Sequence, residues 1–576
     1  MRFSLTVKNV MTMKQFLKYA CLAVLISMAA GKGQARTINI DVSTIKGDLT
    51  KELRAIGDRV VIGDTVVLEF GKGTYTIDGT IQFRSSAIIR GQGRDKTTLI
   101  LDNGSDRSGF KAFKDDSFIN ILGRKDHTIF ASVSDISFKL KDHKGIWWTD
   151  GERYAMKIYH ANRVDINRVD SYMANAHITN FDLRVCSNVT VTDCNITNFN
   201  NSQTGGCLWL RGEMHNIIVK NNKFYKYGND ETLAVYSRLV DNTKDYIRGR
   251  ASRTDIFIEN NDFYYGGYKE KDKDPSAVNN MIVSLFTDNK KSDDPCITRN
   301  FHLKGNTFYI NDKCTRCLYV SFAPADQHSD IYIEGNAIIN SNLKMSDKYY
   351  RQDIEVNDES KNQDTIFITG NTVQNSNPVM NKYNTNGYSF LLMQGGHVCL
   401  DGNKIINTAM TDPSTGKSTG VQLVWAGAKG GTVTMRNNVC KGLKNISTVG
   451  AGGGTPLFTL NATNNYFSGD TRIYCDKITQ LHLNFTNNTF ESNNANFFLQ
   501  EFASKGTLVF NNNQVTVSSG GGKLMTHWAK TSLNSMRFDR LEVRNNSFQG
   551  VKSETDLFKN MTNIGKRQVK NNRFRP

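Results

Sequence analysis

The sequence predicts an all-β solenoid of stacked coils, and two observations support this fold class. A short pattern returns fifteen times between Ile136 and the C-terminus: an apolar residue, spacers, a polar residue that is usually Asn, one more spacer and an apolar residue. Copies lie as little as 23 residues apart. Apolar and polar residues alternate around each copy, which is the period of a β-strand. Units of this length bury their apolar faces by stacking on their neighbours.

The polar residue of each copy marks a fixed place in the repeat. Asn tolerates the left-handed backbone conformation and its amide bonds locally, so one Asn per unit indicates a sharp bend between strands. In stacked coils these amides would also bond to one another along the axis. We therefore assign the marker residues a structural role. They are Ile136, Val169, Cys194, Asn222, Asn261, Asn306, Asn336, Asn371, Asn403, Asn438, Asn465, Asn488, Asn513, Asn546 and Asn572.

A capping helix is predicted before the repeats. Residues 47–60 place Leu49, Leu53, Ile56 and Val60 on one helical stripe, which suits a short amphipathic helix that covers the open first coil. Short apolar segments that begin at or near glycines follow it. They are Gly63–Glu69, Gly73–Ile77, Gly79–Phe83 and Ile88–Ile100.

At these segments the chain resembles the pectate-lyase-like superfamily of right-handed parallel β-helices, and the resemblance extends from about residue 40 onward. It implies a right-handed single-stranded parallel β-helix with an N-terminal capping helix, whereas the activity has to be argued from the site. The expected organisation is a signal peptide over 1–35, a cap and first coils over 36–110, and further coils over 111–576 that form one domain with 36–110.

The first 35 residues have the features of a targeting segment. Lys14 and Lys18 precede the apolar run Tyr19–Ala30, and small residues before Arg36 suit signal-peptidase cleavage there. No other stretch is long enough to span a membrane. We therefore expect a secreted or periplasmic protein whose mature chain begins at Arg36.

The charge of the chain favours a polyanionic partner. Five basic and no acidic residues precede Arg36, so cleavage lowers the net charge from +17 to +12. An exported protein rarely meets nucleic acid, so uronate or sulfated polysaccharides are the expected partners. A generally basic surface without a specific partner is the alternative.

Nine cysteines follow Arg36, and two of them form the motif Cys314-Thr-Arg-Cys317. The motif has neither a second cysteine pair nor histidine partners, which argues against zinc. Export would permit disulfides, and the sequence leaves their pairing open.

Aligned strands of successive coils bring cations and aromatic rings onto one outward face. With aliphatic residues inward, the outward set is Lys157, Tyr159, Arg184, Trp209, Arg211, Tyr236, Arg238 and Tyr319. Guanidinium groups bind carboxylates in bidentate fashion and aromatic rings stack on sugars, so this face suits an acidic glycan. Cross-strand packing is the competing explanation. Long intervals after residues 222 and 261 predict loops beside this face.

The expected reaction is β-elimination on a uronate-containing or sulfated polysaccharide. Arg184, Arg211 and Arg238 would neutralise the carboxylate next to the C5 proton, and Lys157 or Tyr159 would remove that proton. The remaining candidates divide by role. His160 and His177 are alternative bases or substrate contacts, Trp209, Tyr236 and Tyr319 are stacking residues, and Glu213, Asp230 and Glu231 are candidate ligands for Ca²⁺.

Two other functions remain open at this point. A glycoside hydrolase would use two carboxylates from Asp182, Glu213, Asp230 and Glu231, but the motifs of polygalacturonases and of pectate lyases are both missing from the sequence. A carbohydrate-binding β-helix would need no base at all. Two structural expectations accompany these alternatives: the side chain of Arg211 points away from the core and does not affect folding, and residues within 553–565 or a partner cover the last coil.

Overall fold

The computed structural model describes most of the chain after the targeting segment. The described residues are 35–102, 117–141, 153–174, 178–199, 205–228, 231–237, 252–266, 281–287, 296–310, 314–341, 351–376, 388–408, 420–449, 455–475, 478–501, 504–527, 537–559 and 564–576. Residues 1–34, which hold most of the predicted signal peptide, lie outside this range. None of the helices in the described ranges has the length and apolar character needed to cross a bilayer.

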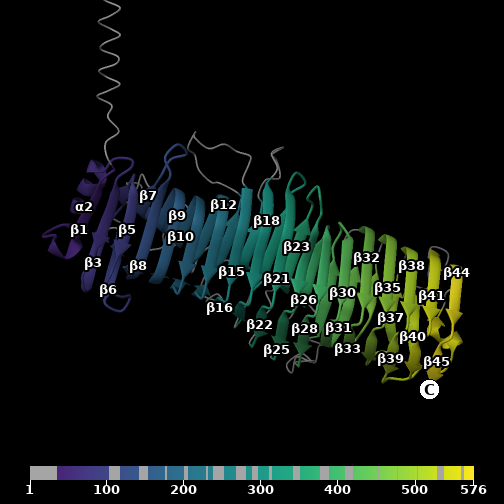
Figure 1. The fold of residues 1–576 in the computed structure, drawn as a ribbon. Coiled ribbons are helices and arrows are strands. Elements are labelled where there is room, and N and C mark those ends of the chain that lie inside the picture. The colour runs from purple at the N-terminus through teal and green to yellow at the C-terminus, as the bar shows by residue number, and fades with distance from the viewer. Residues whose placement is uncertain are drawn as a thin grey trace, which may run out of the picture.

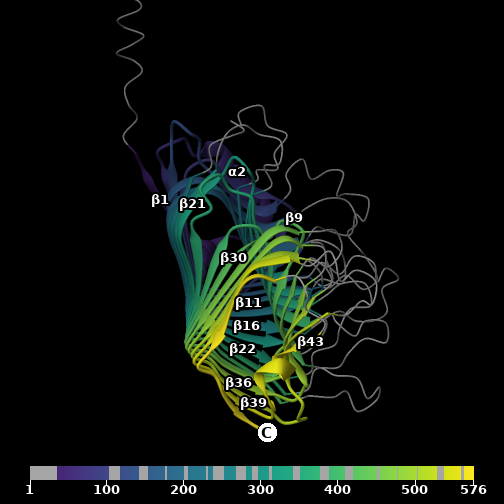
Figure 2. The same ribbon diagram turned by 90° about the vertical axis from the view of Figure 1, so that its right-hand side faces the viewer.

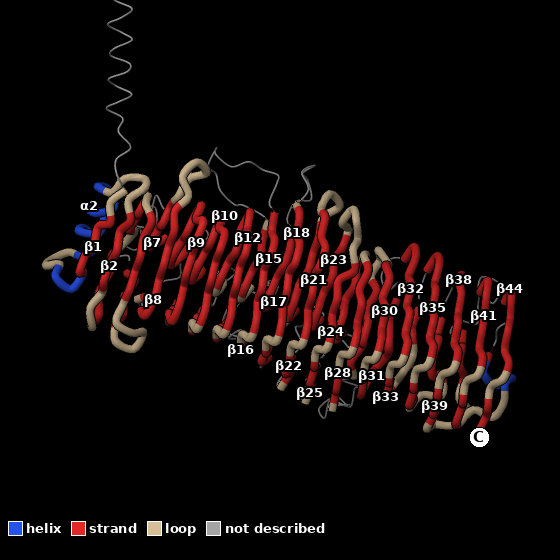
Figure 3. The backbone as a smooth tube through the Cα atoms, viewed as in Figure 1, coloured by secondary structure: helices blue, strands red, loops and turns tan. Residues whose placement is uncertain are grey.

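The chain is a right-handed parallel β-helix, as the sequence predicts (Figure 1). Strands of successive coils lie side by side along the whole length of the molecule (Figure 3). All strand pairs that join the coils are parallel, for example those of β12 (Leu208–Lys220) with β10 (Ile178–Thr192) and with β14 (Leu233–Tyr236). Crossovers between parallel strands are right-handed in nearly all proteins, because a right-twisted strand packs back onto its sheet in that sense.

Each coil contributes a segment to three sheets, which form the walls of the helix (Figure 2). The first sheet contains β4 (Ile81–Phe83), β7 (Ser117–Leu122), β14, β17 (Met281–Phe286), β20 (Arg316–Phe322), β23 (Arg351–Asp358), β26 (Tyr388–Gln394), β29 (Val421–Ala426), β34 (Ile473–Cys475), β37 (Asn496–Glu501), β40 (Lys523–His527) and β43 (Phe558–Lys559). The second contains β1 (Thr37–Asp41), β2 (Thr65–Glu69), β5 (Ser86–Arg90), β15 (Ser252–Glu259), β18 (Ile297–Lys304), β21 (Gln327–Glu334), β24 (Thr365–Thr369), β27 (His397–Asp401), β30 (Gly431–Arg436), β32 (Thr455–Thr463), β35 (Ile478–Thr486), β38 (Ser504–Asn511), β41 (Arg537–Arg544) and β44 (Ile564–Lys570).

The third sheet contains β3 (Gly73–Asp78), β6 (Thr97–Asp102), β11 (Asn195–Phe199), β13 (Lys223–Tyr227), β16 (Asp262–Tyr265), β19 (Thr307–Ile310), β22 (Ala337–Asn340), β25 (Thr372–Asn375), β28 (Lys404–Asn407), β33 (Tyr466–Gly469), β36 (Thr489–Ser492), β39 (Gln514–Val517), β42 (Ser547–Gln549) and β45 (Arg573–Arg575). Five long strands bend around corners and belong to more than one sheet. They are β8 (Ile129–Leu140), β9 (Arg153–Ala174), β10, β12 and β31 (Val439–Val449).

The marker asparagines form one hydrogen-bonded column between the second and third sheets. Asn222 donates its backbone N–H to Oδ1 of Asn261 at 2.9 Å and its Nδ2 to the carbonyl oxygen of Val191 at 2.8 Å. The same backbone-to-amide bond recurs from Asn261 onward and ends at Asn572. The predicted stacking of the amides is therefore confirmed.

The bend itself belongs to the residue before each marker. Asn221 has φ 58° and Gly305 has φ 63°, both in the left-handed region, where Asn and Gly are tolerated. The sequence pattern assigned both the bend and the amide stacking to a single Asn. In the structure the residue before the marker makes the bend, and the marker makes the hydrogen bonds. Cys194 begins the column, because its N–H donates to Oδ1 of Asn222 at 3.0 Å.

The two ends of the helix differ. At the N-terminal end, α2 (Leu49–Arg59) buries Leu53 completely beside β3 and β4, as a cap requires, and the short 3₁₀ helix η1 (Val42–Thr44) precedes it. At the C-terminal end, the 3₁₀ helix η4 (Glu554–Leu557) precedes β43, and β43 continues the first sheet by pairing with β40. Residues 553–559 complete the last coil and do not fold over it, and residues 560–563 lie outside the described range, so cover by a partner stays a prediction.

Candidate functional site

Side chains on the outer face of the first sheet line up in two rows. Leu208 and Leu210 of β12 belong to the interior core, whereas Trp209 packs in a separate cluster with Tyr154 and Ala234. Strand register brings each outward residue opposite its equivalent in the next coil. One row holds Lys157, Asp182, Trp209 and Ala234, and the other holds Tyr159, Arg184, Arg211 and Tyr236. Together with Tyr154 we call these residues the first-sheet cluster.

Asp182 binds both arginines of the cluster. Its Oδ2 accepts a hydrogen bond from Nε of Arg184 at 2.6 Å, and its Oδ1 lies 3.3 Å from Nε of Arg211. All three side chains are at most 3% exposed. Two guanidinium groups therefore share one carboxylate. The three side chains together carry a net charge of one positive unit.

Arg211 lies among three aromatic rings. Its guanidinium carbon is 4.0 Å from the ring centroid of Trp209, 5.6 Å from that of Tyr154 and 5.8 Å from that of Tyr236. Its Nη1 also donates to the hydroxyl oxygen of Tyr154 at 3.3 Å. Cation–π contacts in a desolvated setting are worth about 2 kcal/mol each, so the rings help to hold this buried charge.

The burial of the two arginines corrects one expectation. Arg211 does point away from the interior core, but it is not exposed, and its removal would leave a cavity and disturb the charge of Asp182. Trp209 is equally buried, and its Nε1 has no hydrogen-bond partner among the described residues. A Cβ at Gly206 would lie 2.4 Å from this Nε1, which explains why glycine precedes the strand.

Lys157, Tyr159 and His160 are half-buried at the N-terminal side of the cluster. Lys157 pairs in register with Asp182, and Tyr159 pairs with Arg184, so both proposed bases lie one coil, about 4.8 Å, from the charged group. His160 follows at the corner with φ 52°, and its ring centroid lies 4.2 Å from that of Tyr159. Burial lowers the pKa of His160, so this histidine is neutral near pH 7.

An aromatic strip extends from the cluster toward the C-terminal coils. Ring centroids are 6.1 Å apart between Trp209 and Tyr236, 4.2 Å between Tyr236 and Phe286, and 6.0 Å between Phe286 and Tyr319. Tyr319 lies three coils, about 14 Å, from Trp209. The guanidinium carbon of Arg316 lies 5.4 Å from the ring centroid of Tyr319. The strip becomes more exposed along this direction, since Trp209 is buried and the three later rings are half-buried.

The candidate calcium ligands do not gather at one place. Glu231 is buried beside Gly206, before the first-sheet strand, whereas Glu213 is exposed beyond its other end, after the corner at Gly212, and contacts His215. Seven residues of chain, roughly 20 Å at about 3.3 Å per residue, separate these two places. The part of the chain that the structure describes holds no group of three His, Cys, Asp or Glu side chains suited to a metal. Asp230 lies outside that part, so Ca²⁺ stays a prediction.

Two further sequence-predicted residues, Arg238 and His177, also lie outside the described residues. In turn, the sequence analysis missed Tyr154, which supplies both a ring and a hydroxyl to Arg211. It treated Asp182 only as a possible hydrolase carboxylate. The spacing of Asp182 and Arg184, two residues apart on one strand face, was the available signal for their ion pair.

Comparisons with known proteins do not assign this chain to a family. The sequence matches no protein-family model, and the search among curated proteins found no match. Among solved structures, the A-module of the mannuronan C-5 epimerase AlgE6 of Azotobacter vinelandii is 13% identical over 79% of this chain and 99% of that chain, with a TM-score of 0.37. A PL6 alginate lyase is 11% identical over 93% and 89%, with a TM-score of 0.32. The tailspike protein of E. coli bacteriophage HK620 is 13% identical over 92% and 75%, with a TM-score of 0.35.

These similarities are too low to transfer an activity. The protein is therefore classified by its own strands and side chains, as a right-handed parallel β-helix with a basic and aromatic cluster on the outer face of its first sheet.

Proposed function

We propose that this protein is exported and cleaves an acidic polysaccharide by β-elimination at the outer face of the first sheet. The observation that carries the proposal is the sharing of Asp182 by Arg184 and Arg211, which leaves a positive charge fixed one coil from Lys157 and Tyr159 and next to the aromatic strip. A charge held in a low-dielectric setting acts strongly on an anion at the surface.

The half-buried residues are the ones that contact the glycan in this proposal. A uronate carboxylate lies over Lys157 and Tyr159, while sugar rings extend along Tyr236 and Tyr319. One of the first two residues takes the C5 proton, the electron pair forms the C4–C5 double bond, and the C4–O bond breaks. The leaving sugar oxygen takes up a proton. Positive charge at the carboxylate stabilises the carbanion-like transition state.

The same geometry argues against a hydrolase centred on Asp182. A general acid must reach the glycosidic oxygen, whereas the side chain of Asp182 is completely buried between the guanidinium groups of Arg184 and Arg211. A second candidate function is glycan binding without catalysis. It is favoured by the burial of Arg184 and Arg211, which leaves Lys157 as the half-exposed cation of the cluster.

One assay separates these functions. The purified chain is incubated with a panel of polyuronates and glycosaminoglycans, and both unsaturated-product absorbance and new reducing ends are followed. β-Elimination raises both signals, hydrolysis raises only the second, and a binding protein retains glycan while raising neither.

A matched pair of variants then tests the site. We expect Tyr159→Phe or Lys157→Met to abolish turnover and to retain glycan binding. Tyr225→Phe serves as the control, because Tyr225 lies in the third sheet within a stack of tyrosine rings. Full activity of both first-sheet variants would place the reaction elsewhere on the protein.

A further inference from the structure

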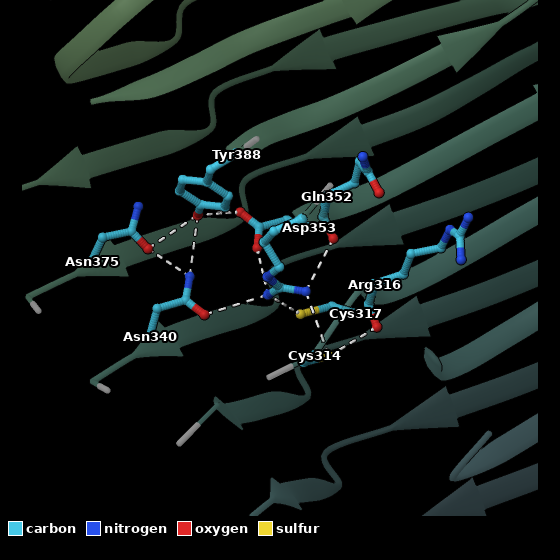
Figure 4. A network of polar contacts seen from close by, with 9 residues as sticks. Cys314, Arg316, Cys317, Asn340, Gln352, Asp353, Asn375 and Tyr388 are labelled. Carbon is cyan, nitrogen blue, oxygen red and sulfur yellow. Dashed lines mark hydrogen bonds and ion pairs between the residues drawn. The ribbon is translucent and has the colours of Figure 1, made fainter. Parts of the chain in front are cut away.

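A second polar cluster lies inside the β-helix, between the first and third sheets (Figure 4). Its centre is Arg351 in β23, whose Nη1 donates to Sγ of Cys314 at 3.5 Å and whose Nη2 donates to Sγ of Cys317 at 3.0 Å. Nη2 also donates to Oδ1 of Asp353 at 2.8 Å. Each of these side chains is at most 4% exposed, so the CxxC motif lies in the protein interior.

The remaining partners hold the carboxylate of Asp353 in place. The hydroxyl of Tyr388 donates to Oδ2 of Asp353 at 2.7 Å, and Nδ2 of Asn340 donates to the hydroxyl oxygen of Tyr388 at 3.1 Å. The carboxylate of Asp353 therefore pairs with the guanidinium of Arg351. The same guanidinium also donates one hydrogen bond to the sulfur of Cys314 and one to that of Cys317. We call these residues, with Cys314 and Cys317, the Arg351 network.

The two thiols contact each other as well as Arg351. Burial alone would raise the pKa of Cys314, but its hydrogen bond with Cys317 and the charge of Arg351 lower the pKa below the usual value. The same contact and burial raise the pKa of Cys317. A guanidinium beside both sulfurs also disfavours a metal cation between them, because like charges repel. These opposite directions assign Cys314 as the attacking sulfur of the pair and Cys317 as the resolving sulfur.

We propose that Cys314 and Cys317 are a redox-active pair that forms a reversible disulfide. When the interior opens locally, the thiolate of Cys314 attacks a small-molecule disulfide such as oxidised glutathione, forms a mixed disulfide and releases one thiolate. Cys317 then loses its proton and displaces the second thiol. In total the pair loses two electrons and the proton of Cys317, and the glutathione disulfide gains them and leaves as one thiolate and one thiol.

The position of Arg351 predicts that this disulfide is easily reduced. A disulfide across four residues closes a short loop, so it restricts the unfolded chain little. The positive charge stabilises the thiolate of the reduced form, and stabilising the reduced form makes a disulfide more oxidising. The pair is thus suited to exchange with thiols and contributes little permanent cross-linking.

The test equilibrates the full chain with glutathione buffers of increasing oxidised fraction. A low concentration of denaturant opens the interior, and alkylation under reducing conditions verifies that both thiols react. After acid quenching and alkylation, we expect the peptide that holds the motif to change from two alkyl groups to none, and a reductant to reverse the change. Cys440→Ser should behave like the parent, because Cys440 is a buried cysteine outside the Arg351 network.

Two variants complete the experiment. Cys317→Ser should stop at the mixed disulfide of Cys314 with glutathione, which mass spectrometry resolves. Arg351→Lys keeps the charge but loses the fork that reaches both sulfurs, and we expect its disulfide to be at least about tenfold harder to reduce. Thiols that alkylate fully yet form no intramolecular disulfide at any glutathione ratio would overturn the proposal.

Discussion

Asp182 and Arg211 are joined across neighbouring coils, with Oδ1 of the first 3.3 Å from Nε of the second and both side chains almost completely buried. Removing water from a charge is costly, so each group depends on the other and on Arg184. The ion pair therefore links the stability of these coils to the charge of the proposed site.

Replacing Asp182 by Asn leaves two buried guanidinium groups without their carboxylate. We expect Asp182→Asn to lower the free energy of unfolding by about 3 kcal/mol in denaturant titrations. Asp401→Asn is the control, because Asp401 pairs with the half-exposed Arg436 at 3.6 Å, and exposed pairs contribute less than about 1 kcal/mol. Equal losses in the two variants would mean that burial adds nothing to the first pair.

Arg211→Ala should affect both activity and folding. The variant removes a cation from the site, so we expect the rate on the preferred polyanion to fall at least about tenfold. It also empties a space between Tyr154, Trp209 and Tyr236, which should cost about 2–4 kcal/mol of stability. Rates are measured well below the unfolding temperature. Arg544→Ala, in the distant β41, should retain the parent rate; a parental rate in Arg211→Ala would place the site elsewhere.

The asparagine column should tolerate loss at its end better than loss at its middle. Asn371 accepts from the N–H and Nδ2 of Asn336, and donates to Asn403 and to the carbonyl of Ile333. Asn371→Ala leaves buried polar groups of both neighbouring coils without hydrogen-bond partners. We therefore expect the free energy of unfolding, measured in denaturant, to fall by about 3 kcal/mol.

Asn572→Ala is the matched variant at the column end. Asn572 is half-buried, so water can satisfy the freed groups and the loss should stay below about 1 kcal/mol. The reverse ranking of the two variants would contradict a cooperative column.

Lys444 should give the protein a pH-dependent stability in the alkaline range. Burial lowers its pKa to about 8, while the unfolded chain keeps the value near 10.4. Between about pH 8 and pH 10.4 the unfolded state therefore binds more protons, and stability contributed by this residue rises with pH. Below pH 8 the protonated side chain disfavours the folded state in full.

The change Lys444→Met removes this titration. After allowance for solvent screening, we expect the variant to be about 1–2 kcal/mol more stable than the parent at pH 7, and the difference to shrink toward pH 10. Free energies of unfolding measured at several pH values check this. Lys441→Met, at an exposed position of the same strand, should leave the pH profile unchanged. A constant difference between Lys444→Met and the parent at all pH values would rule out the titration of Lys444 as its cause.

Much of the architecture could be predicted because it is local and repeated. Residue alternation identifies the strands, the Asn222-type markers identify the corners, and the stripe through Leu53 identifies the cap. Each of these signals depends on neighbouring residues in one coil, and stacking then repeats it. The same reasoning correctly separated inward from outward residues around Trp209.

The candidate site was predicted only in part, because its energetics depend on residues from different coils. Sequence placed Arg184 and Arg211 on one face, but their shared contact with Asp182 and the ring of Tyr154 arises from strand register and from chain segments up to 57 residues apart. The sequence pattern predicts that Arg184 and Arg211 point outward, but it does not predict that their side chains are buried.

The sequence by itself determined the coil repeat, the capped N-terminal end and the outward face that collects cations and aromatic rings, since these follow from period and composition. Only the tertiary structure decided which charges are shared, which are buried and which thiols touch. Cys314 and Cys317 are a bare CxxC in the sequence, and Arg351, 34 residues after Cys317, gives the pair its chemistry. The physical reason is that desolvation and charge pairing are set by what surrounds a group in space, and the surroundings here come from several coils.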